Sequence, residues 1–341
     1  MTQHRSRTAD FLKGVALMAM VQVVLTEFFA TDTVLNSIVG KVSMFFGGAP
    51  AAPVFLAIMG YYIADTGKPF LEMIVRGIKL MLLGFAVNAG RNAPRLYDIL
   101  AGTLNDDPLK YIFGVDILIL AGLSVIAMAL VIRVFDGHVL LYVGLILVFL
   151  FLQYIIPPVE KYYPDSYLLP YFYGKYPGAY FPFIPWFAYV LAGFVFYQIK
   201  HFFVAESFKH NHKVKVVLVV LSGLLLLASL PFGFNVTIRP QYFAHHGLLF
   251  FLFCVNFLFW WLLSARAIVE RVDNLVTRYL EWAGRNVTAF YMVFMILSGN
   301  FSAWQKKGDL MWLLVVFAGM VGLTTFIVWI YENQIKKRFL H

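Results

Sequence analysis

The chain has 341 residues, of which 61% are hydrophobic and only 13% are charged, and its formal net charge is +9. Soluble domains carry about 25% charged residues, so this composition excludes a soluble globular protein. The apolar runs are close to 20 residues long, the length of a helix that crosses about 30 Å of hydrocarbon. The basic residues lie between these runs, where they orient membrane proteins, so no nucleic-acid partner is expected.

Ten membrane-spanning helices are predicted in chain order, which makes the fold class all-α, a polytopic helix bundle. The spans are 11–30, 42–64, 70–89, 111–132, 138–156, 181–199, 214–232, 248–264, 286–304 and 310–331. The first run has no small-residue cleavage site, so it is predicted to be a retained span and not a signal peptide. No internal repeat is present, and one transmembrane domain over residues 1–341 is predicted.

An even number of spans places both termini on the same side of the membrane. On that side lie 18 of the 27 Lys and Arg residues, and nine lie on the other. Cytoplasmic loops carry the excess of Lys and Arg, so both termini are predicted to be cytoplasmic. Tyrosines and Trp186 gather between residues 171 and 186, which indicates an interfacial aromatic belt at the outer boundary.

Two adjacent histidines, His245 and His246, precede the eighth span on the predicted outer face. Imidazole is the commonest general base because its pKa lies near 6.5, and a carboxylate of Glu27 or Asp116 would fix its tautomer. Adjacent helical residues point about 100° apart, so only one histidine can face a given cavity, and His246 is preferred because it is nearer the apolar run. The alternative is that both are interfacial polar residues.

Asp116 is predicted to lie about one turn inside the fourth span, where a charged group is costly and is retained when it has a function. On the inner side, Arg76 and Lys79 are three residues apart and share one face of the third span. Two cations on one face suit an anionic cofactor. The alternative is ordinary cytoplasmic anchoring by basic residues.

The stretch "FGGAPAAPVFLAIMGYY" at 46–62 combines Gly, Pro and Ala within the second span. Such helices pack closely and are often broken where they line a cavity, so an interior cavity is expected near the outer half of this span. No cluster of His and Cys has zinc spacing and no phosphate-binding glycine loop is present, so no metal is expected.

Five stretches resemble, in the expected order, the spans of multi-span acyltransferases. They are "RTADFLKGVALMAMVQVV", "GGAPAAPVFLAIMGYYI", "GVDILILAGLSVI", "FPFIPWFAYVLAGFVF" and "WAGRNVTAFYMVFM". Within that superfamily the chain is most similar to bacterial relatives of heparan-alpha-glucosaminide N-acetyltransferase. The resemblance covers nearly the whole chain.

The resemblance implies an acyltransferase of the bacterial inner membrane that moves an acetyl group from cytoplasmic acetyl-CoA to an amine or hydroxyl of a periplasmic saccharide. An outer histidine would act as general base or acyl carrier, with Asp116 and Glu27 beside it. Related enzymes also suggest a homodimer. The residues expected to bind the cofactor are Lys13, Arg76, Lys79, Arg285 and Asn286, and those expected to bind the acceptor are Asn88, Arg91, Arg239 and Asn300.

One departure from the family concerns the outer third of the first span, where relatives often carry a histidine. Here Val23, Val24, Leu25 and Thr26 occupy that stretch. Either the base lies in the 245–246 pair or the chain is a catalytically inactive subunit. The other alternative is a transporter of a small solute or lipid-linked sugar, although no repeat relates two halves of the chain as in many transporters.

Overall fold

The structure is a computed structural model that describes residues 6–135, 137–157, 159–176, 179–204 and 212–336. The regular elements of these residues are helices, and the one β-bridge among them joins Ala30 to Gly308. Seven of the described helical segments are long and apolar enough to cross a membrane. The predicted all-α fold class is therefore confirmed, and the chain is a multi-pass membrane protein.

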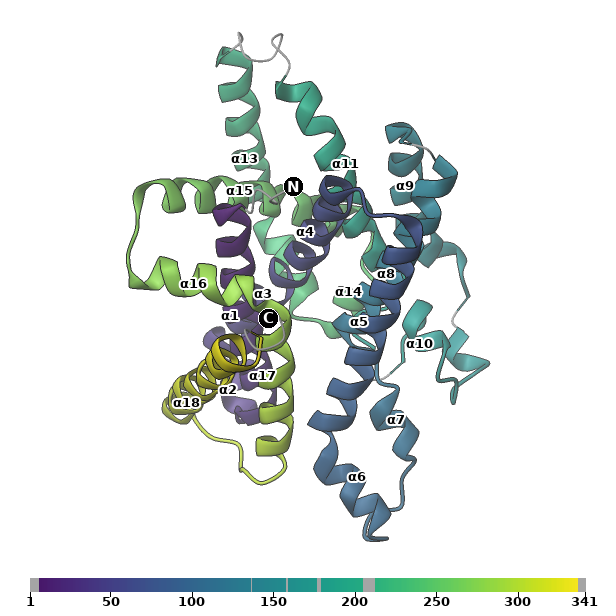
Figure 1. The fold of residues 1–341 in the computed structure, drawn as a ribbon, viewed down its shortest axis with the longest axis vertical. Helices are drawn as coiled ribbons and strands as arrows, with labels where there is room; N and C mark the ends of the chain where they lie inside the picture. Colours follow the sequence, from purple (N-terminus) through teal and green to yellow (C-terminus); the bar gives the residue numbers. More distant parts are fainter. Residues whose placement is uncertain (1–5, 136, 158, 177–178, 205–211, 337–341) are drawn as a thin grey trace. The chain divides into compact units, whose positions relative to one another are not determined.

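A helix or a pair of helices accounts for each of the ten predicted spans (Figure 1). They are α1 (Arg7–Phe29), α3 (Ile38–Gly48) with α4 (Ala51–Thr66), α5 (Phe70–Arg91), α8 (Ile117–Phe135), α9 (Val139–Ile155), α11 (Phe183–Val204), α13 (His212–Thr237), α15 (Leu248–Arg271), α17 (Val287–Ser302) and α18 (Leu310–Ile330). Of these, α5 carries several charges, and α9 and α17 are shorter apolar helices. The number of membrane crossings and the side of the termini stay predictions.

Short helices lie between these segments. They are α2 (Asp32–Asn36), α6 (Ala93–Leu100), α7 (Pro108–Ile112), η1 (Val159–Lys161), α10 (Leu169–Phe172), α14 (Pro240–Ala244), α16 (Leu275–Arg285) and η2 (Tyr331–Lys336). The amphipathic α16 was not expected from the sequence, because its charged residues read as a loop. It begins with a capping box in which Asn274 and Thr277 each bond the other's backbone N–H.

Two predicted spans have different boundaries in the structure. The second span is broken at residues 49–50, between α3 and α4, as the Pro- and Gly-containing sequence predicted. The fourth was predicted to begin at residue 111, but α8 begins only at Ile117. Asp116 therefore does not lie one turn inside the helix. It precedes the helix, as expected for a residue type that favours the N-cap.

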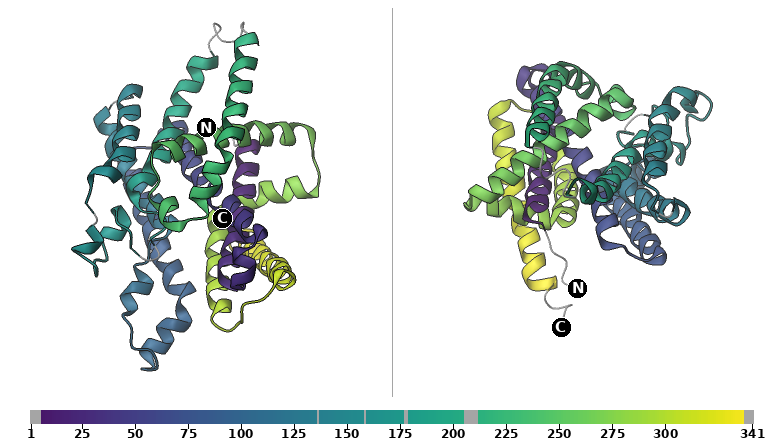
Figure 2. Two further views of the ribbon diagram at one scale, coloured as in Figure 1. Left: turned by 180° about the vertical axis from the view of Figure 1, so that it is seen from behind. Right: turned by 90° about the horizontal axis from the view of Figure 1, so that it is seen from above.

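The helices form two compact units. The first comprises Met1–Ala52, Ala86–Ile112 and Trp261–His341, and the second Pro53–Phe85 and Phe113–Trp260. In the first unit α1 packs against α3, α16, α17 and α18 (Figure 1, Figure 2). In the second, α11 packs against α8 and α9. The expectation of one domain over residues 1–341 stays a prediction.

Pairs of glycines allow helices in each unit to approach backbone to backbone. A Cβ on Gly14 of α1 would lie 2.0 Å from the Leu280 carbonyl oxygen of α16, and one on Gly284 would lie 1.8 Å from that of Asp10. In the second unit, a Cβ on Gly193 of α11 would lie 1.9 Å from the Ala57 carbonyl oxygen of α4. Small residues at helix crossings are typical of membrane bundles, because packing rather than hydrophobic burial drives helices together in lipid.

We predict that Gly193→Ala lowers the apparent melting temperature in detergent by several degrees, because overpacking costs roughly 1–3 kcal/mol. Gly144→Ala in α9 is the matched control, since a Cβ there meets nothing within 4 Å. The control should leave the melting temperature unchanged or raise it slightly, because Ala is the better helix former. Scanning fluorimetry of the purified variants measures both, and equal shifts would contradict the close crossing.

Candidate functional site

The histidine pair lies in the connection between two helices of the second unit and not within a helix. His245 is the C-cap residue of α14, and α15 begins two residues after His246, at Leu248. The expectation that the pair follows helical geometry is therefore wrong, although the two rings do have separate surroundings. Gly247, which follows them, packs closely on the Tyr154 hydroxyl.

His246 is a core histidine with 2% of its surface exposed. Its Nδ1 lies 2.7 Å from the Phe243 carbonyl oxygen, which can only accept, so Nδ1 carries the proton and donates it. Nε2 lies 2.9 Å from the Tyr189 hydroxyl and therefore accepts from it. Burial lowers the His246 pKa to about 4. Tyr189 and the Phe243 carbonyl fix the tautomer, which corrects the expectation that Glu27 or Asp116 would do so.

Aromatic residues of α11 pack on His246, together with Phe250 of α15. The Trp186 indole lies with its centroid 5.0 Å from that of the imidazole, and its Nε1 donates to the Ala244 carbonyl oxygen at 3.1 Å. Trp186 is completely buried, so it does not belong to an interfacial belt as was predicted. A buried indole needs a partner for its N–H, and the end of α14 supplies it. Neither Tyr189 nor this contact was signalled by the sequence.

His245 has the more open environment of the pair. It is half-buried, its ring centroid lies 5.7 Å from that of Tyr173, and its Nδ1 is a buried atom without a hydrogen-bond partner. Burial and the nearby Lys175 charge lower its pKa to about 4, against the opposing effects of Glu160 and a hydrogen bond to the Gly174 backbone. A neutral imidazole with an unpaired nitrogen can accept a proton. On geometry, His245 is better suited to be a base than His246, the residue preferred from the sequence.

The two predicted catalytic carboxylates have different settings. Asp116 is 2% exposed, and its Oδ1 accepts the Leu118 N–H at 2.8 Å, which caps α8. Glu27 is exposed on α1 of the first unit, close to the end of that helix. The structure thus gives Asp116 a helix-capping role, while Glu27 is accessible.

Three of the predicted cofactor-binding residues lie along the crossing of α1 and α16. Lys13 Nζ is 2.7 Å from Asp10 Oδ1, and Asp10 in turn packs on Gly284, the residue before Arg285. Arg285 is exposed. Asn286 donates through Nδ2 to Glu332 at 3.1 Å. The structure therefore brings Lys13, Arg285 and Asn286 into one region.

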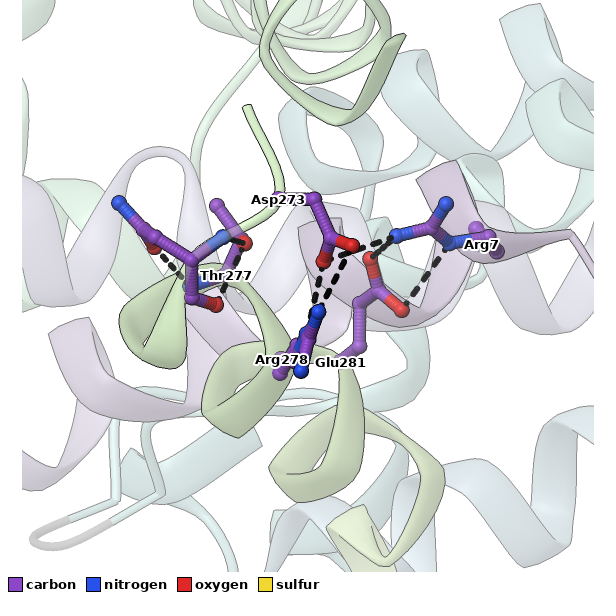
Figure 3. A network of polar contacts seen from close by, with 6 residues as sticks. Arg7, Asp273, Thr277, Arg278 and Glu281 are labelled. Atoms are coloured by element: carbon purple, nitrogen blue, oxygen red, sulfur yellow. Dashed lines mark hydrogen bonds and ion pairs between the residues drawn. The ribbon is translucent and has the colours of Figure 1, made fainter. Parts of the chain in front are cut away.

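An ion-pair network joins the start of α1 to α16 next to this region (Figure 3). Arg7 donates to both carboxylate oxygens of Glu281, at 2.9 and 3.2 Å, and Arg278 donates to both of Asp273, at 2.9 Å each. Arg7 also lies 3.9 Å from Asp273. The network was missed from the sequence because α16 was not predicted, although the alternating charges of "VDNLVTRYLEWAGR" were its signal.

Arg76 and Lys79, the other two predicted cofactor-binding residues, belong to the second unit. Both are exposed on α5. Gly77, between them, packs on the Gly122 carbonyl oxygen of α8, so this side of the helix is packed, while Arg76 and Lys79 lie among exposed apolar residues such as Val75 and Ile78.

The predicted acceptor-binding residues are mostly engaged with backbone. Asn88 is completely buried and donates to the Ile112 carbonyl oxygen at 3.1 Å. Asn300 donates to the Gly90 carbonyl oxygen at 2.7 Å, and Gly299 beside it packs on Arg91. The structure therefore brings these three together at the ends of α5 and α17. Arg239 belongs to the second unit, where it is exposed and lies 5.8 Å from the Tyr242 ring centre.

This architecture defines a class, a multi-pass membrane protein with buried polar side chains paired inside its helix bundle and exposed cations on α5 and α16. The family profile described as heparan-alpha-glucosaminide N-acetyltransferase, catalytic, matches residues 5–227. The chain belongs to this family of acetyltransferases, which use acetyl-CoA. A comparison with curated proteins found no match. The histidine pair and Arg285 lie beyond the matched residues.

We predict that acid destabilises the protein through the buried imidazole. His246 has a folded pKa near 4 and an unfolded value near 6.5, so the unfolded chain binds more protons between these pH values. Stability should therefore fall as the pH drops from about 6.5 to 4, by up to roughly 3 kcal/mol from this group. Between pH 6.5 and 4, the melting temperature should fall more steeply with pH for the wild type than for His246→Gln. The same dependence of melting temperature on pH in both proteins would contradict a buried, neutral His246 ring.

Proposed function

We propose that the chain is a transmembrane acyltransferase that moves an acetyl group from cytoplasmic acetyl-CoA to an amine or hydroxyl of a periplasmic saccharide. The observation that carries this proposal is the match of the catalytic family profile over residues 5–227 of a multi-pass helical chain. The charge asymmetry of the loops supports an inner donor and an outer acceptor, with both termini in the cytoplasm of a bacterial inner membrane. We also propose a homodimer, by analogy with related enzymes.

The donor would be held by cations of the predicted inner face. Arg285 is exposed beside the α1–α16 crossing, and Arg76 and Lys79 share the exposed face of α5. Guanidinium and ammonium groups form charge-assisted hydrogen bonds with phosphates such as those of coenzyme A. Lys13 is already 2.7 Å from Asp10, so its proposed part is to neutralise that carboxylate next to Arg285.

The reaction transfers the acetyl group from sulfur to nitrogen or oxygen. The neutral acceptor amine or hydroxyl attacks the thioester carbonyl carbon, the carbon–sulfur bond breaks, and an amide or ester bond forms. The acceptor loses one proton to the base, and the coenzyme A thiolate takes one up. Asn88, Arg91, Asn300 and Arg239 would orient the saccharide.

We assign the base role to His245. Its buried Nδ1 is without a hydrogen-bond partner, and its half-buried ring lies near Tyr173 and the charges of Lys175 and Glu160. A low pKa keeps the ring in its neutral, unprotonated form at neutral pH, and it also makes the ring a weaker base than an ordinary imidazole. His246 would position its neighbour by anchoring the connection to α11 through Tyr189.

A second candidate is a catalytically inactive acyltransferase-like subunit. The observation that favours it is the absence of a first-span histidine, since Val23 to Thr26 occupy that stretch and His246 has both ring nitrogens engaged. An active acyltransferase and an inactive subunit would both bind acetyl-CoA, but only the active enzyme would transfer the acetyl group.

We predict that the purified protein binds acetyl-CoA and transfers radiolabelled acetyl to glucosamine. Calorimetry measures the binding. Arg76→Ala should raise the dissociation constant for acetyl-CoA by roughly tenfold, because it removes one charge-assisted hydrogen bond to phosphate. Arg239→Ala, an exposed arginine of the predicted outer face, is the control. Absence of acetyl-CoA binding would rule out the enzyme, whereas binding without transfer would favour the inactive subunit.

We predict that His245→Ala lowers kcat by about 10²–10⁴-fold, the usual contribution of a general base, without changing acetyl-CoA affinity or melting temperature. His246→Ala should lower both kcat and the melting temperature, because it removes a buried hydrogen-bonded ring. His138→Ala, an exposed histidine before α9, is the control. Unchanged turnover of His245→Ala would contradict its role as the base.

A further inference from the structure

The chain turns from α15 into α16 at a corner, residues 268–276, that exposes large apolar side chains (Figure 1). Leu275 is 84% exposed and Val276 63%, and Ile268 and Val272 are each 39% exposed. Because α15 is one of the helices able to cross a membrane, its last turn and the residues after it meet the boundary between hydrocarbon and head groups. The bilayer is therefore the medium around these side chains.

The corner is a fixed surface, because the rest of α16 is held by the protein. Glu281, Ala283 and Gly284 are buried, and the helix packs closely on α1. The capping box of Asn274 and Thr277 satisfies the backbone at the first turn of α16, which carries Leu275 and Val276. The two exposed side chains thus belong to a capped helical turn and not to a frayed end.

Most of the charged side chains at the corner are already paired. Arg266 Nε lies 2.7 Å from Glu270 Oε1, and Arg278 donates to both carboxylate oxygens of Asp273 (Figure 3). Arg271 differs from them. It is exposed, and among the residues that the structure describes none forms a hydrogen bond or an ion pair with its guanidinium. One uncompensated cation therefore lies among the exposed apolar side chains.

This combination fits a molecule that carries an anion directly beside hydrocarbon. A guanidinium pairs with phosphate through two hydrogen bonds, and its apolar stem can lie along acyl chains. A soluble phosphate would leave the apolar side chains uncovered. A second copy of the chain, joined symmetrically here, would bring a second uncompensated Arg271 to the same small surface. An anionic phospholipid meets both requirements.

We propose that the corner between α15 and α16 binds an anionic phospholipid, with its phosphate at Arg271 and its acyl region beside Ile268, Val272 and Val276. Juxtamembrane arginines attract anionic lipids in this way. Since α16 packs on α1, a lipid bound here ties the first unit to the head-group layer of the bilayer.

Native mass spectrometry of the full-length protein in detergent, titrated with phosphatidylglycerol or phosphatidylcholine, tests the role of the charge. Arg271→Gln should raise the dissociation constant for phosphatidylglycerol by roughly fivefold, the effect of one arginine at a charged membrane surface, and leave that for phosphatidylcholine nearly unchanged. The melting temperature should not change, because this side chain forms no bond within the described protein.

The matched control is the double variant Arg266→Gln/Glu270→Gln, which removes an exposed arginine of the same helix together with its partner. Its affinity for phosphatidylglycerol should equal that of the wild type. An equal loss in both variants would overturn the proposal in favour of general attraction to basic residues. Displacement of the lipid by inorganic phosphate would overturn it in favour of a soluble ligand.

A fluorescent label at the corner tests the apolar contact separately. Val276→Cys can be labelled with bimane selectively, because the native Cys254 is completely buried. In phosphatidylglycerol nanodiscs, bromine on the acyl chains should quench the label, whereas iodide in the water should not. Quenching by iodide alone would overturn the proposal, and so would protection from both quenchers, which would show that a second copy covers the corner.

Discussion

A bilayer offers no hydrogen-bond partners, so each polar side chain placed among membrane-spanning helices must be satisfied within the protein. This constraint organises the polar groups of both units. Asn88 bonds the Ile112 carbonyl, Asp116 caps α8, and His246 is held between Tyr189 and the Phe243 carbonyl. The glycine crossings serve the same requirement, because close backbone approach keeps the helices and their polar groups away from lipid.

The same constraint explains which parts of the fold were predictable from sequence. Hydrophobic length marks a helix that spans a bilayer, so each predicted span has its helix, and the Pro- and Gly-containing stretch at 46–62 is interrupted between α3 and α4. The segments that connect the spans have no comparable pattern of hydrophobic length. The amphipathic α16 and the late start of α8 depend on capping by Asn274 and Asp116, which are local hydrogen bonds that hydropathy does not register.

The candidate site was harder to predict, because residue type does not show whether a side chain is already satisfied. The sequence favoured His246 over His245 for its proximity to the apolar run. In the structure that proximity means burial, with Tyr189 and a carbonyl engaging both ring nitrogens. Tyr189, the partner of Nε2, comes from α11, more than 50 residues earlier in the chain, and no pattern in either segment predicts this contact.

Burial and hydrogen bonding thus distinguish residues that the sequence alone predicted to share one functional site. A buried polar group whose hydrogen bonds are satisfied stabilises the bundle, whereas a group with an unpaired nitrogen or an exposed charge can still form a new interaction. By this criterion His245, Arg76 and Lys79 are the stronger candidates for chemistry, whereas Asp116 and His246 support the fold.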